Sequence, residues 1–215
     1  MNHIAHFLLA PHTGEGAVGT LLADFHRGPI AASLPEEIVA AIALHRAIDS
    51  HTDRNPAAGA AKALFAPGLR RYAGVALDLY FDHCLVREWD RFATMPFDAF
   101  VGATYERLAT GQDAEYVPDR MRRLAHAMRT DDWLGAYRDF EGVERALGRL
   151  NHAIRHRFGR EVDLLPLGQE LLRLGPRLDA AFGMLFPVVA RLAQVHLASR
   201  TIAPKRLAMV RHEVE

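Results

Sequence analysis

Residues 33–53 read SLPEEIVAAIALHRAIDSHTD, and this stretch decides the fold of the chain. It opens with a serine, an early proline and two glutamates, which together are typical of a helix start. Isoleucines then recur at helical spacing and give the segment one apolar face. We expect a helix that runs to about Asp49, because Asn55-Pro56 indicates the start of the next one.

Helical patterns continue on both sides of this stretch, and most of them begin at a proline or end at a glycine. The other predicted helices cover residues 14–25, 56–64, 70–91, 95–111, 118–130, 140–157 and 164–200. We expect the last to divide into two helices near Gly175-Pro176 and to kink at Pro187. No stretch alternates between apolar and polar residues, so no sheet is predicted. The prediction is an all-α, single-domain helical bundle over residues 1–203, with a frayed tail at 204–215.

The charges of the chain balance, with 26 basic and 26 acidic residues and no net charge when histidine is neutral. A globally basic nucleic-acid-binding protein is therefore not indicated. Cys84 is the sole cysteine, so no intrachain disulfide can form, which suits a reducing compartment. The apolar N-terminus is too short to span a bilayer and lacks the basic region of a signal peptide. We expect a soluble, cytoplasmic protein with no nucleic-acid or membrane partner.

Residues 45–53 carry the first group of candidate metal ligands. His45 and Asp49 are four residues apart and share one face of the predicted helix. Asp53 continues that face if the helix extends, whereas His51 is expected at the helix end or in a short loop. Imidazole nitrogen and carboxylate oxygen together suit Mn²⁺, Fe²⁺ or Mg²⁺ better than a structural zinc ion, which normally recruits cysteines.

Two further acidic positions lie in apolar surroundings. Asp78 and Asp82 share a face of the helix predicted at 70–91, where neighbouring carboxylates raise each other's pKa unless a cation lies between them. Asp24 follows an apolar run and needs a partner if it is buried. Each acid also has a structural interpretation, as part of a surface ion pair, a solvated helix face or a helix N-terminal contact. Together, the His45/Asp49 pair, the Asp78/Asp82 pair and Asp24 favour one shared metal site.

Arginines cluster in the second half of the chain. Arg145 and Arg149 are four residues apart and share one helix stripe, and the stretch also contains Arg120, Arg122, Arg123, Arg129, Arg155 and Arg157. The structural interpretation is a solvated helix face. The functional interpretation is the docking of an acidic partner or of a phosphate-bearing substrate.

Four segments resemble the acyl carrier protein phosphodiesterase family. They are MNHIAH at residues 1–6, GTLLADFHRG at 19–28, HRAIDSHTD at 45–53 and Asp82-His83. Their order and spacing match over roughly residues 1–90, and the later half is similar in its Arg-rich helical character and in GPRLD at 175–179. Leu8 departs from the pattern, because members of the family often carry a second histidine there. This departure bears on the role of His6.

The resemblance implies a helical protein that is distantly related to HD-type phosphohydrolases, although Asp82-His83 reverses the tandem His-Asp of true HD domains. It also implies hydrolysis of the phosphodiester that joins 4′-phosphopantetheine to a serine of holo-acyl carrier protein, a reaction of lipid metabolism. A divalent metal would be required, most often Mn²⁺, with Mg²⁺ or Fe²⁺ as alternatives. The partner would be the acidic carrier protein, and an apolar channel between helices would hold the pantetheine arm.

Roles follow for the candidate residues. The expected metal ligands, direct or indirect, are Asp24, His45, Asp49, Asp78 and Asp82. The expected catalytic residues are Asp24, a general acid at His83 or His51, and Arg46 for the charge of the phosphate. The expected substrate contacts are Arg27, Asp53 and His6.

Two alternatives stay open. The first is a helical metal phosphohydrolase that acts on a nucleotide or another small phosphodiester. The second is a non-catalytic helical module that binds a carrier protein, which predicts binding without turnover and without a bound metal.

Overall fold

The computed structural model describes residues 1–158 and 163–210, with side chains described up to residue 155 and over 163–199. Within these ranges the chain forms helices and turns without a strand, which confirms the predicted all-α class. The elements in chain order are α1 (His3–Leu9), α2 (Gly14–Leu22), α3 (Glu36–Arg54), α4 (Pro56–Ala63), η1 (Arg70–Tyr72), α5 (Ala73–Arg87), α6 (Trp89–Phe92), α7 (Phe97–Gly111), α8 (Asp119–Thr130), η2 (Gly135–Arg138), α9 (Phe140–Phe158) and α10 (Pro166–Val210).

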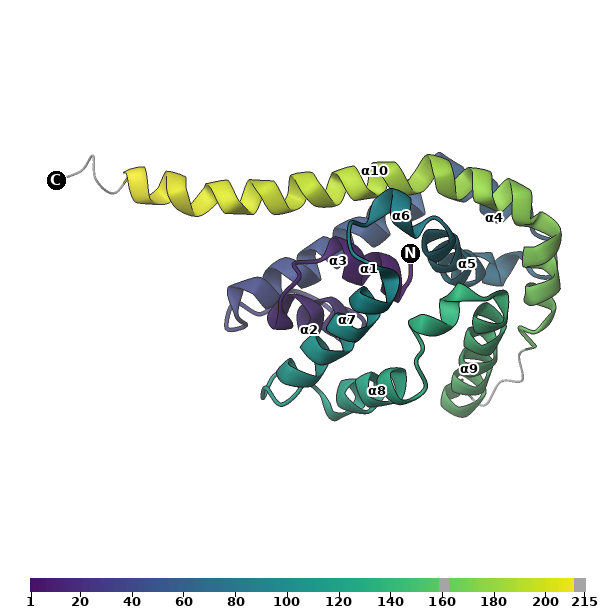
Figure 1. Cartoon of the computed structure of the whole chain (residues 1–215), viewed down its shortest axis with the longest axis horizontal. Coiled ribbons are helices and arrows are strands. Elements are labelled where there is room, and N and C mark those ends of the chain that lie inside the picture. Colours follow the sequence, from purple (N-terminus) through teal and green to yellow (C-terminus); the bar gives the residue numbers. More distant parts are fainter. Residues whose placement is uncertain (159–162, 211–215) are drawn as a thin grey trace.

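The helices form two groups that α10 joins (Figure 1). In the first group, α2 packs along α3 and α7. In the second, α5 packs against η2 and α9. The short helix α1 contacts both α2 and α5, and α10 contacts α3, α4, α5 and α9. The N-terminus therefore lies between the two groups, while the far end of α10 extends away from them (Figure 1).

Local sequence explains where several helices begin. Thr13 accepts a hydrogen bond from the Gly16 backbone at 2.9 Å and so caps α2. Asn55 accepts one from the Ala57 backbone, also at 2.9 Å, and Pro56 occupies the first position of α4. The cap of α3 differs from the prediction, because Pro35 stands at the position just before the helix and Ser33 lies outside it.

Helix α3 is longer than predicted and ends at Arg54. Its buried face, which includes Ile38, Ile42 and Ile48, lies in the core. Since the helix continues past Asp49, Asp53 does extend the face of His45 and Asp49, and His51 lies on the helix rather than in a loop.

Helix α10 runs without a break through Gly175-Pro176 and Pro187, so the predicted division into two helices is wrong. A proline inside a helix costs about 3 kcal/mol. Packing offsets this cost, because α10 buries a face that includes Leu178, Phe182 and Phe186. The first half of α10 curves in Figure 1 and the second half runs straight. The expected tail from residue 204 begins within this helix, and residues 211–215 lie outside the described ranges.

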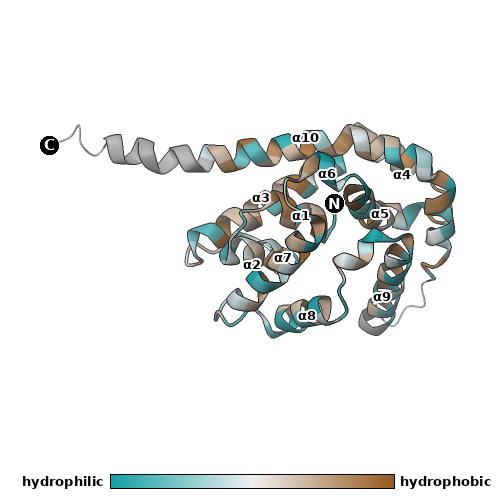
Figure 2. Cartoon of the chain, viewed as in Figure 1, coloured by the Kyte–Doolittle hydropathy of each residue, from teal (hydrophilic) through white to brown (hydrophobic). Residues whose placement is uncertain are grey.

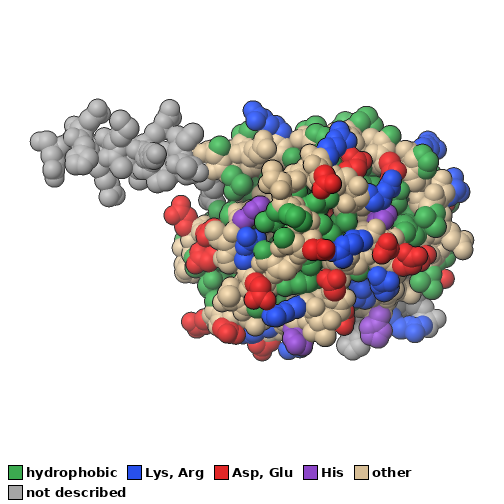
Figure 3. Space-filling model, viewed as in Figure 1, with side chains coloured by type: hydrophobic (Ala, Val, Ile, Leu, Met, Phe, Trp, Pro, Cys, Tyr) green, Lys and Arg blue, Asp and Glu red, His purple; other side chains and the backbone are tan. Residues whose placement is uncertain are grey.

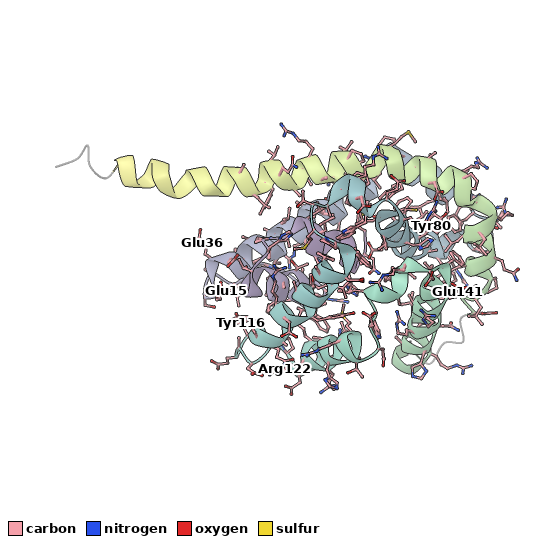
Figure 4. All side chains as sticks on the ribbon, in the orientation of Figure 1. Glu15, Glu36, Tyr80, Tyr116, Arg122 and Glu141 are labelled. Atoms are coloured by element: carbon pink, nitrogen blue, oxygen red, sulfur yellow. The ribbon has the colours of Figure 1, made fainter. Side chains whose placement is uncertain are left out.

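A polar contact fixes the curved half of α10 to α5. The Asp179 carboxylate accepts hydrogen bonds from the Tyr80 hydroxyl at 2.9 Å and from the Arg87 guanidinium at 3.2 Å, while the Cys84 thiol lies 3.4 Å away. Tyr80 is labelled on α5 in Figure 4, on the side toward α10. Burial raises the pKa of the Cys84 thiol, and Asp179 raises it further, so this cysteine is a poor nucleophile.

One helix of the described chain, Pro166–Ser199 of α10, is long and apolar enough to cross a membrane by length and composition alone. A core helix of a globular protein meets the same criterion. Figure 2 shows hydrophilic and hydrophobic residues side by side along α10. Leu178, Phe182 and Phe186 of α10 face the core, whereas Met184, Val188 and Val195 are exposed, and 33% of the apolar window is buried.

Gly19 allows α2 to approach α3 closely. A Cβ atom there would lie 2.8 Å from the Ala41 Cβ and 3.0 Å from the Ile38 backbone. We expect Gly19→Ala to lower the free energy of unfolding by up to about 2 kcal/mol, because overpacking costs about 1–3 kcal/mol and the gain in helix propensity is about 1 kcal/mol. Urea unfolding measures the change.

Gly102→Ala is the matched control, because a Cβ atom at this position of α7 meets nothing within 4 Å. It is expected to be neutral or stabilising by up to about 1 kcal/mol. Equal effects of the two substitutions would show that the α2–α3 contact has room for a methyl group.

Candidate metal centre

A polar cavity of about 270 Å³ opens where α1, α3 and α5 meet the end of α2. Its wall contains four aspartates and three histidines from segments that are distant in the sequence. The lining residues are Met1, Asn2, His3, His6, Asp24, His45, Asp49, Thr52, Asp53 and Asp78.

His45 has a fixed orientation at the base of this cavity. Its ring Nδ1 lies 2.9 Å from the Thr20 carbonyl oxygen, which can only accept, so Nδ1 carries the proton. The Nε2 atom faces Asp49 Oδ2 at 3.2 Å and Asp24 Oδ1 at 3.6 Å. Carboxylates are also acceptors, so a neutral His45 would point a lone pair at two negative groups. A proton or a cation between them removes this conflict.

His6 stacks on His45, with ring centroids 3.7 Å apart and planes at 6°. Its Nε2 lies 3.0 Å from Asp49 Oδ1, and its buried Nδ1 has no partner within the described part of the chain. Burial lowers the pKa of His6 to about 4, against the opposing effect of Asp49. His6 is therefore neutral at physiological pH, which is the form that binds metals.

Asp49 is the carboxylate shared by both imidazoles. Burial acts to raise its pKa, but hydrogen bonds from His45 and His6 hold the pKa of Asp49 below its usual range. Potential ligand atoms of His6, His45 and Asp49 all lie within 4.8 Å of one another, so the three groups could hold one ion. Two nitrogens and an oxygen match the borderline divalent metals.

The rim of the cavity adds further polar groups. The Met1 amino group donates to Asp78 at 2.7 Å, and Lys62 pairs with Asp53 at 3.1 Å. His3 Nδ1 lies 3.9 Å from Asp24. Asp24, Asp53 and Asp78 thus lie in the same wall as His6, His45 and Asp49.

Asp82 has a different place from the one expected for it. It is fully buried beneath α1, where its Oδ2 accepts the Ile4 backbone N–H at 2.8 Å and its Oδ1 accepts that of Ala5 at 3.2 Å. These are the second and third amides of α1, which has no cap from its own N-terminal side chain. Asp82 therefore lies outside the cavity wall and acts as a helix cap supplied by α5.

Burial is the main cause that raises the pKa of Asp82 to about 7, although the two backbone hydrogen bonds oppose it. A raised pKa means that the native state holds the proton more tightly than the unfolded chain. The resulting stability is present below the unfolded value of about 4 and is lost as the pH rises through about 7.

We therefore expect the stability advantage of the wild type over Asp82→Asn to fall by on the order of 2 kcal/mol between about pH 5 and about pH 8. Urea unfolding of both proteins across this range measures the difference, in which the titrations of groups that do not interact with Asp82 cancel. A pH-independent difference would contradict the raised pKa.

Comparison with known proteins now adds to this geometry. The acyl carrier protein phosphodiesterase family model matches residues 1–189. The chain belongs to this family. Proteins named acyl carrier protein phosphodiesterase from Salmonella paratyphi A, Salmonella agona and Salmonella heidelberg are each 36% identical to it over 148 residues. The match covers 68% of this chain and 76% of each relative. No solved structure matches the chain, so the relationship to HD-type domains stays a prediction.

Four residues assigned from the family resemblance lie away from the cavity wall. His83 is buried, and its Nδ1 donates to the Tyr137 carbonyl oxygen at 2.8 Å. Arg46 donates to the backbone carbonyls of His26 and Gly28, both at 2.8 Å. Arg27 is exposed on the same loop.

His51 lines a separate groove between α3 and α10, together with Val188, Leu192 and Val195. It lies six positions after His45, which places it on a different face of α3 from the cavity. His51 therefore does not line the cavity that contains the acids.

The sequence analysis did not assign four of the cavity residues to the site, namely Met1, Asn2, His3 and Thr52. No helix was predicted before residue 14, but α1 begins at His3 and places His3 and His6 one turn apart. The spacing His3-x-x-His6, which puts both imidazoles on one face of a helix, was the sequence feature that could have indicated His3. Thr52 lies one turn after Asp49, and its buried hydroxyl has no partner among the described residues.

Proposed function

We propose that this protein hydrolyses the phosphodiester between 4′-phosphopantetheine and the serine of holo-acyl carrier protein. Water adds to phosphorus, the bond to the serine oxygen breaks, and the products are 4′-phosphopantetheine and the apo-carrier protein with a free serine hydroxyl. Family membership supports the substrate, and the acidic, histidine-containing cavity supports hydrolysis at a phosphate. We place the reaction in the cytoplasm, with the acidic carrier protein as the macromolecular partner.

We propose further that His6, His45 and Asp49 hold a divalent metal, with Asp24 as an additional ligand or a contact to its water. Mn²⁺ is our first choice, and Mg²⁺ or Fe²⁺ would use the same groups. The supporting observation is the orientation of His45, whose proton lies on the Thr20 side and whose Nε2 faces two carboxylates. A bound divalent metal supplies positive charge for the phosphate and lowers the pKa of a water molecule.

The chain's own groups supply orientation and proton transfer. The Thr20 carbonyl holds the His45 ring with Nε2 toward the cavity, and stacking on His6 prevents rotation of either imidazole. The leaving serine alkoxide needs a proton. His83 and His51 were expected to supply it, but neither lines the cavity, whereas His3 does. We propose His3 as the proton donor; burial lowers its pKa, so only a minor protonated fraction would serve at neutral pH, as a stronger acid.

The test is incubation of the purified protein with holo-acyl carrier protein and Mn²⁺, followed by intact mass measurement. The expected result is loss of the 4′-phosphopantetheine mass from the carrier protein and recovery of the free prosthetic group. A holo-carrier protein that stays intact would refute the substrate. Turnover of a nucleotide or another phosphodiester in the same assay would favour the first alternative, and carrier-protein binding without bound metal would favour a non-catalytic module.

A further inference from the structure

We propose that the solvent-facing side of α10 binds the surface of a membrane that contains anionic lipids. This inference goes beyond the proposed function and does not depend on it. It differs from the expectation of a protein without a membrane partner, because binding at a membrane surface requires an amphipathic helix and no segment that spans the bilayer.

The exposed apolar residues of the protein gather on one helix. Five large hydrophobic side chains of the described residues are exposed, and each lies on α10 or directly before it. They are Leu165, Leu172, Met184, Val188 and Val195. Met184, Val188 and Val195 are 63%, 46% and 54% exposed, and their spacings of four and seven residues place them in one row along the helix. A continuous exposed apolar row indicates an interaction surface.

Two arginines extend this row. Arg177 lies seven residues before Met184 and Arg191 lies seven residues after it, so both share its side of the helix. Both are exposed, and neither has an ion pair or a hydrogen bond with a residue of the described ranges. We call the set of Arg177, Met184, Val188, Arg191 and Val195 the α10 stripe.

The acids of α10 do not offset the charge of the α10 stripe. Up to residue 199 the helix contains two acids, Glu170 and Asp179. Glu170 is buried and pairs with Arg173 at 2.7 Å, and Asp179 accepts hydrogen bonds from α5. From residue 180 to 212 the sequence has no Asp or Glu, and its basic residues are Arg191, Arg200, Lys205, Arg206 and Arg211. A basic, amphipathic helix of this kind is typical of a membrane-surface segment.

An apolar groove lies beside the α10 stripe and shares three residues with it. The groove has a volume of about 460 Å³ between α3 and α10, and its lining includes Val188, Leu192 and Val195 together with Arg191. Hydrophobic and basic side chains also lie side by side along α10 at the upper edge of Figure 3. Lipid chains would contact the aliphatic side chains, while the Arg191 guanidinium would contact a phosphate group.

A second copy of the chain fits the α10 stripe less well than an anionic surface does. An antiparallel pairing centred on Met184 would place Arg177 opposite Arg191 across the interface, because each is seven residues from Met184. A parallel pairing would place each arginine opposite itself. Both arrangements bring like charges together, whereas anionic headgroups would neutralise both arginines.

The carrier protein is not the expected partner of the α10 stripe either. In the proposed reaction the phosphate is bonded directly to the carrier serine, so the carrier must contact the mouth of the polar cavity. His45 and Asp49 line that cavity, whereas His51, on another face of α3, lines the groove beside α10. A membrane bound along the α10 stripe would therefore leave the cavity accessible to a soluble carrier protein.

The experiment is co-sedimentation of the full-length protein with two kinds of vesicle. One kind contains phosphatidylcholine alone, and the other contains equal amounts of phosphatidylcholine and phosphatidylglycerol. Binding is measured at low and at high salt. Light scattering gives the oligomeric state of each protein, the melting temperature reports folding, and turnover of holo-acyl carrier protein is measured without vesicles.

Three double variants are compared with the wild type. They are Arg177→Gln with Arg191→Gln, Val188→Gln with Val195→Gln, and the control Arg123→Gln with Arg145→Gln. The control removes the same charge from exposed arginines of α8 and α9. All six side chains are exposed, so the substitutions leave the buried core unchanged.

The expected result is that the wild type binds the anionic vesicles at least about tenfold more tightly than the phosphatidylcholine vesicles, and less tightly at high salt. The variant without Arg177 and Arg191 should bind the anionic vesicles at least about tenfold more weakly, because each arginine near an anionic surface contributes about fivefold in affinity. The variant without Val188 and Val195 should lose at least about fivefold. The control should change by less than about twofold, because its charges lie more than a screening length of about 10 Å from the bound surface.

Equal binding of the wild type to both kinds of vesicle would overturn the proposal, as would no binding or an equal loss in the control. A wild-type dimer that dissociates in the Val188 and Val195 variant would assign the α10 stripe to self-association instead. Slower turnover of the carrier protein in both stripe variants, with unchanged vesicle binding, would assign it to the carrier. If a double variant does not fold, the single substitutions Arg191→Gln and Val195→Gln replace it, and unchanged vesicle binding in both would overturn the proposal.

Discussion

If the proposed metal site and reaction are correct, replacing Asp49 by alanine is expected to abolish binding of the proposed metal and to lower kcat/KM for holo-acyl carrier protein at least about 100-fold. Asp49 is the carboxylate that contacts both His6 and His45, at 3.0 Å and 3.2 Å. Loss of a group that only orients a metal ligand already costs about 10–100-fold, so loss of a shared ligand should cost more. Metal analysis of the purified variant and mass-based kinetics measure the two effects.

Asp119→Asn provides the matched control for this substitution. Asp119 is an exposed acid of α8 that pairs with Arg122 at 3.0 Å, away from the cavity. The control should keep the metal content and activity of the wild type. An Asp49→Ala protein that retains stoichiometric metal would refute Asp49 as a ligand, and one that retains activity would refute the site.

Asp82→Ala is expected to lower the free energy of unfolding by about 2–6 kcal/mol at about pH 6. The substitution leaves the buried Ile4 and Ala5 amides without an acceptor, and each unsatisfied amide costs about 1–3 kcal/mol. Because α1 also carries His6, the affinity for Mn²⁺ should fall, although Asp82 does not line the cavity. Urea unfolding and a Mn²⁺ titration measure these changes.

Asp82→Asn separates the cap from the carboxyl charge. Its amide oxygen can still accept an N–H, so it should destabilise the protein less than Asp82→Ala and weaken Mn²⁺ binding less. If Asp82→Ala left stability unchanged but removed the metal, Asp82 would be a ligand after all, and the cap would be unimportant.

Most of the helices could be predicted because their boundaries depend on neighbouring residues. Asn55-Pro56 supplies the cap and first position of α4, and Pro96 and Pro118 precede α7 and α8. The exceptions depend on contacts between distant segments. Helix α1 has just 7 residues and takes its cap from α5, and α10 continues through two prolines because its buried face holds it together.

The part of the candidate site that depends on helical spacing could likewise be predicted from the sequence. The spacing of His45 and Asp49 fixes a shared helix face, and the structure brings Asp24 to that face. Helical spacing also placed Asp78 and Asp82 on one face, but it does not reveal what covers each turn. Asp78 lies at the cavity rim while Asp82, one turn later, lies beneath α1. His83 follows Asp82 and is directed to the η2 backbone for the same reason.

Because α1 is short, we expect it to unfold before the other helices. A helix of two turns does not persist alone in water, so α1 depends on its attachments to other parts of the chain. Asp82 provides one attachment from below, and an ion shared by His6 and Asp49 would provide a second from above. Chelation should therefore release the first ten residues before the remaining helices melt, so that amide exchange at these residues becomes a gauge of metal occupancy.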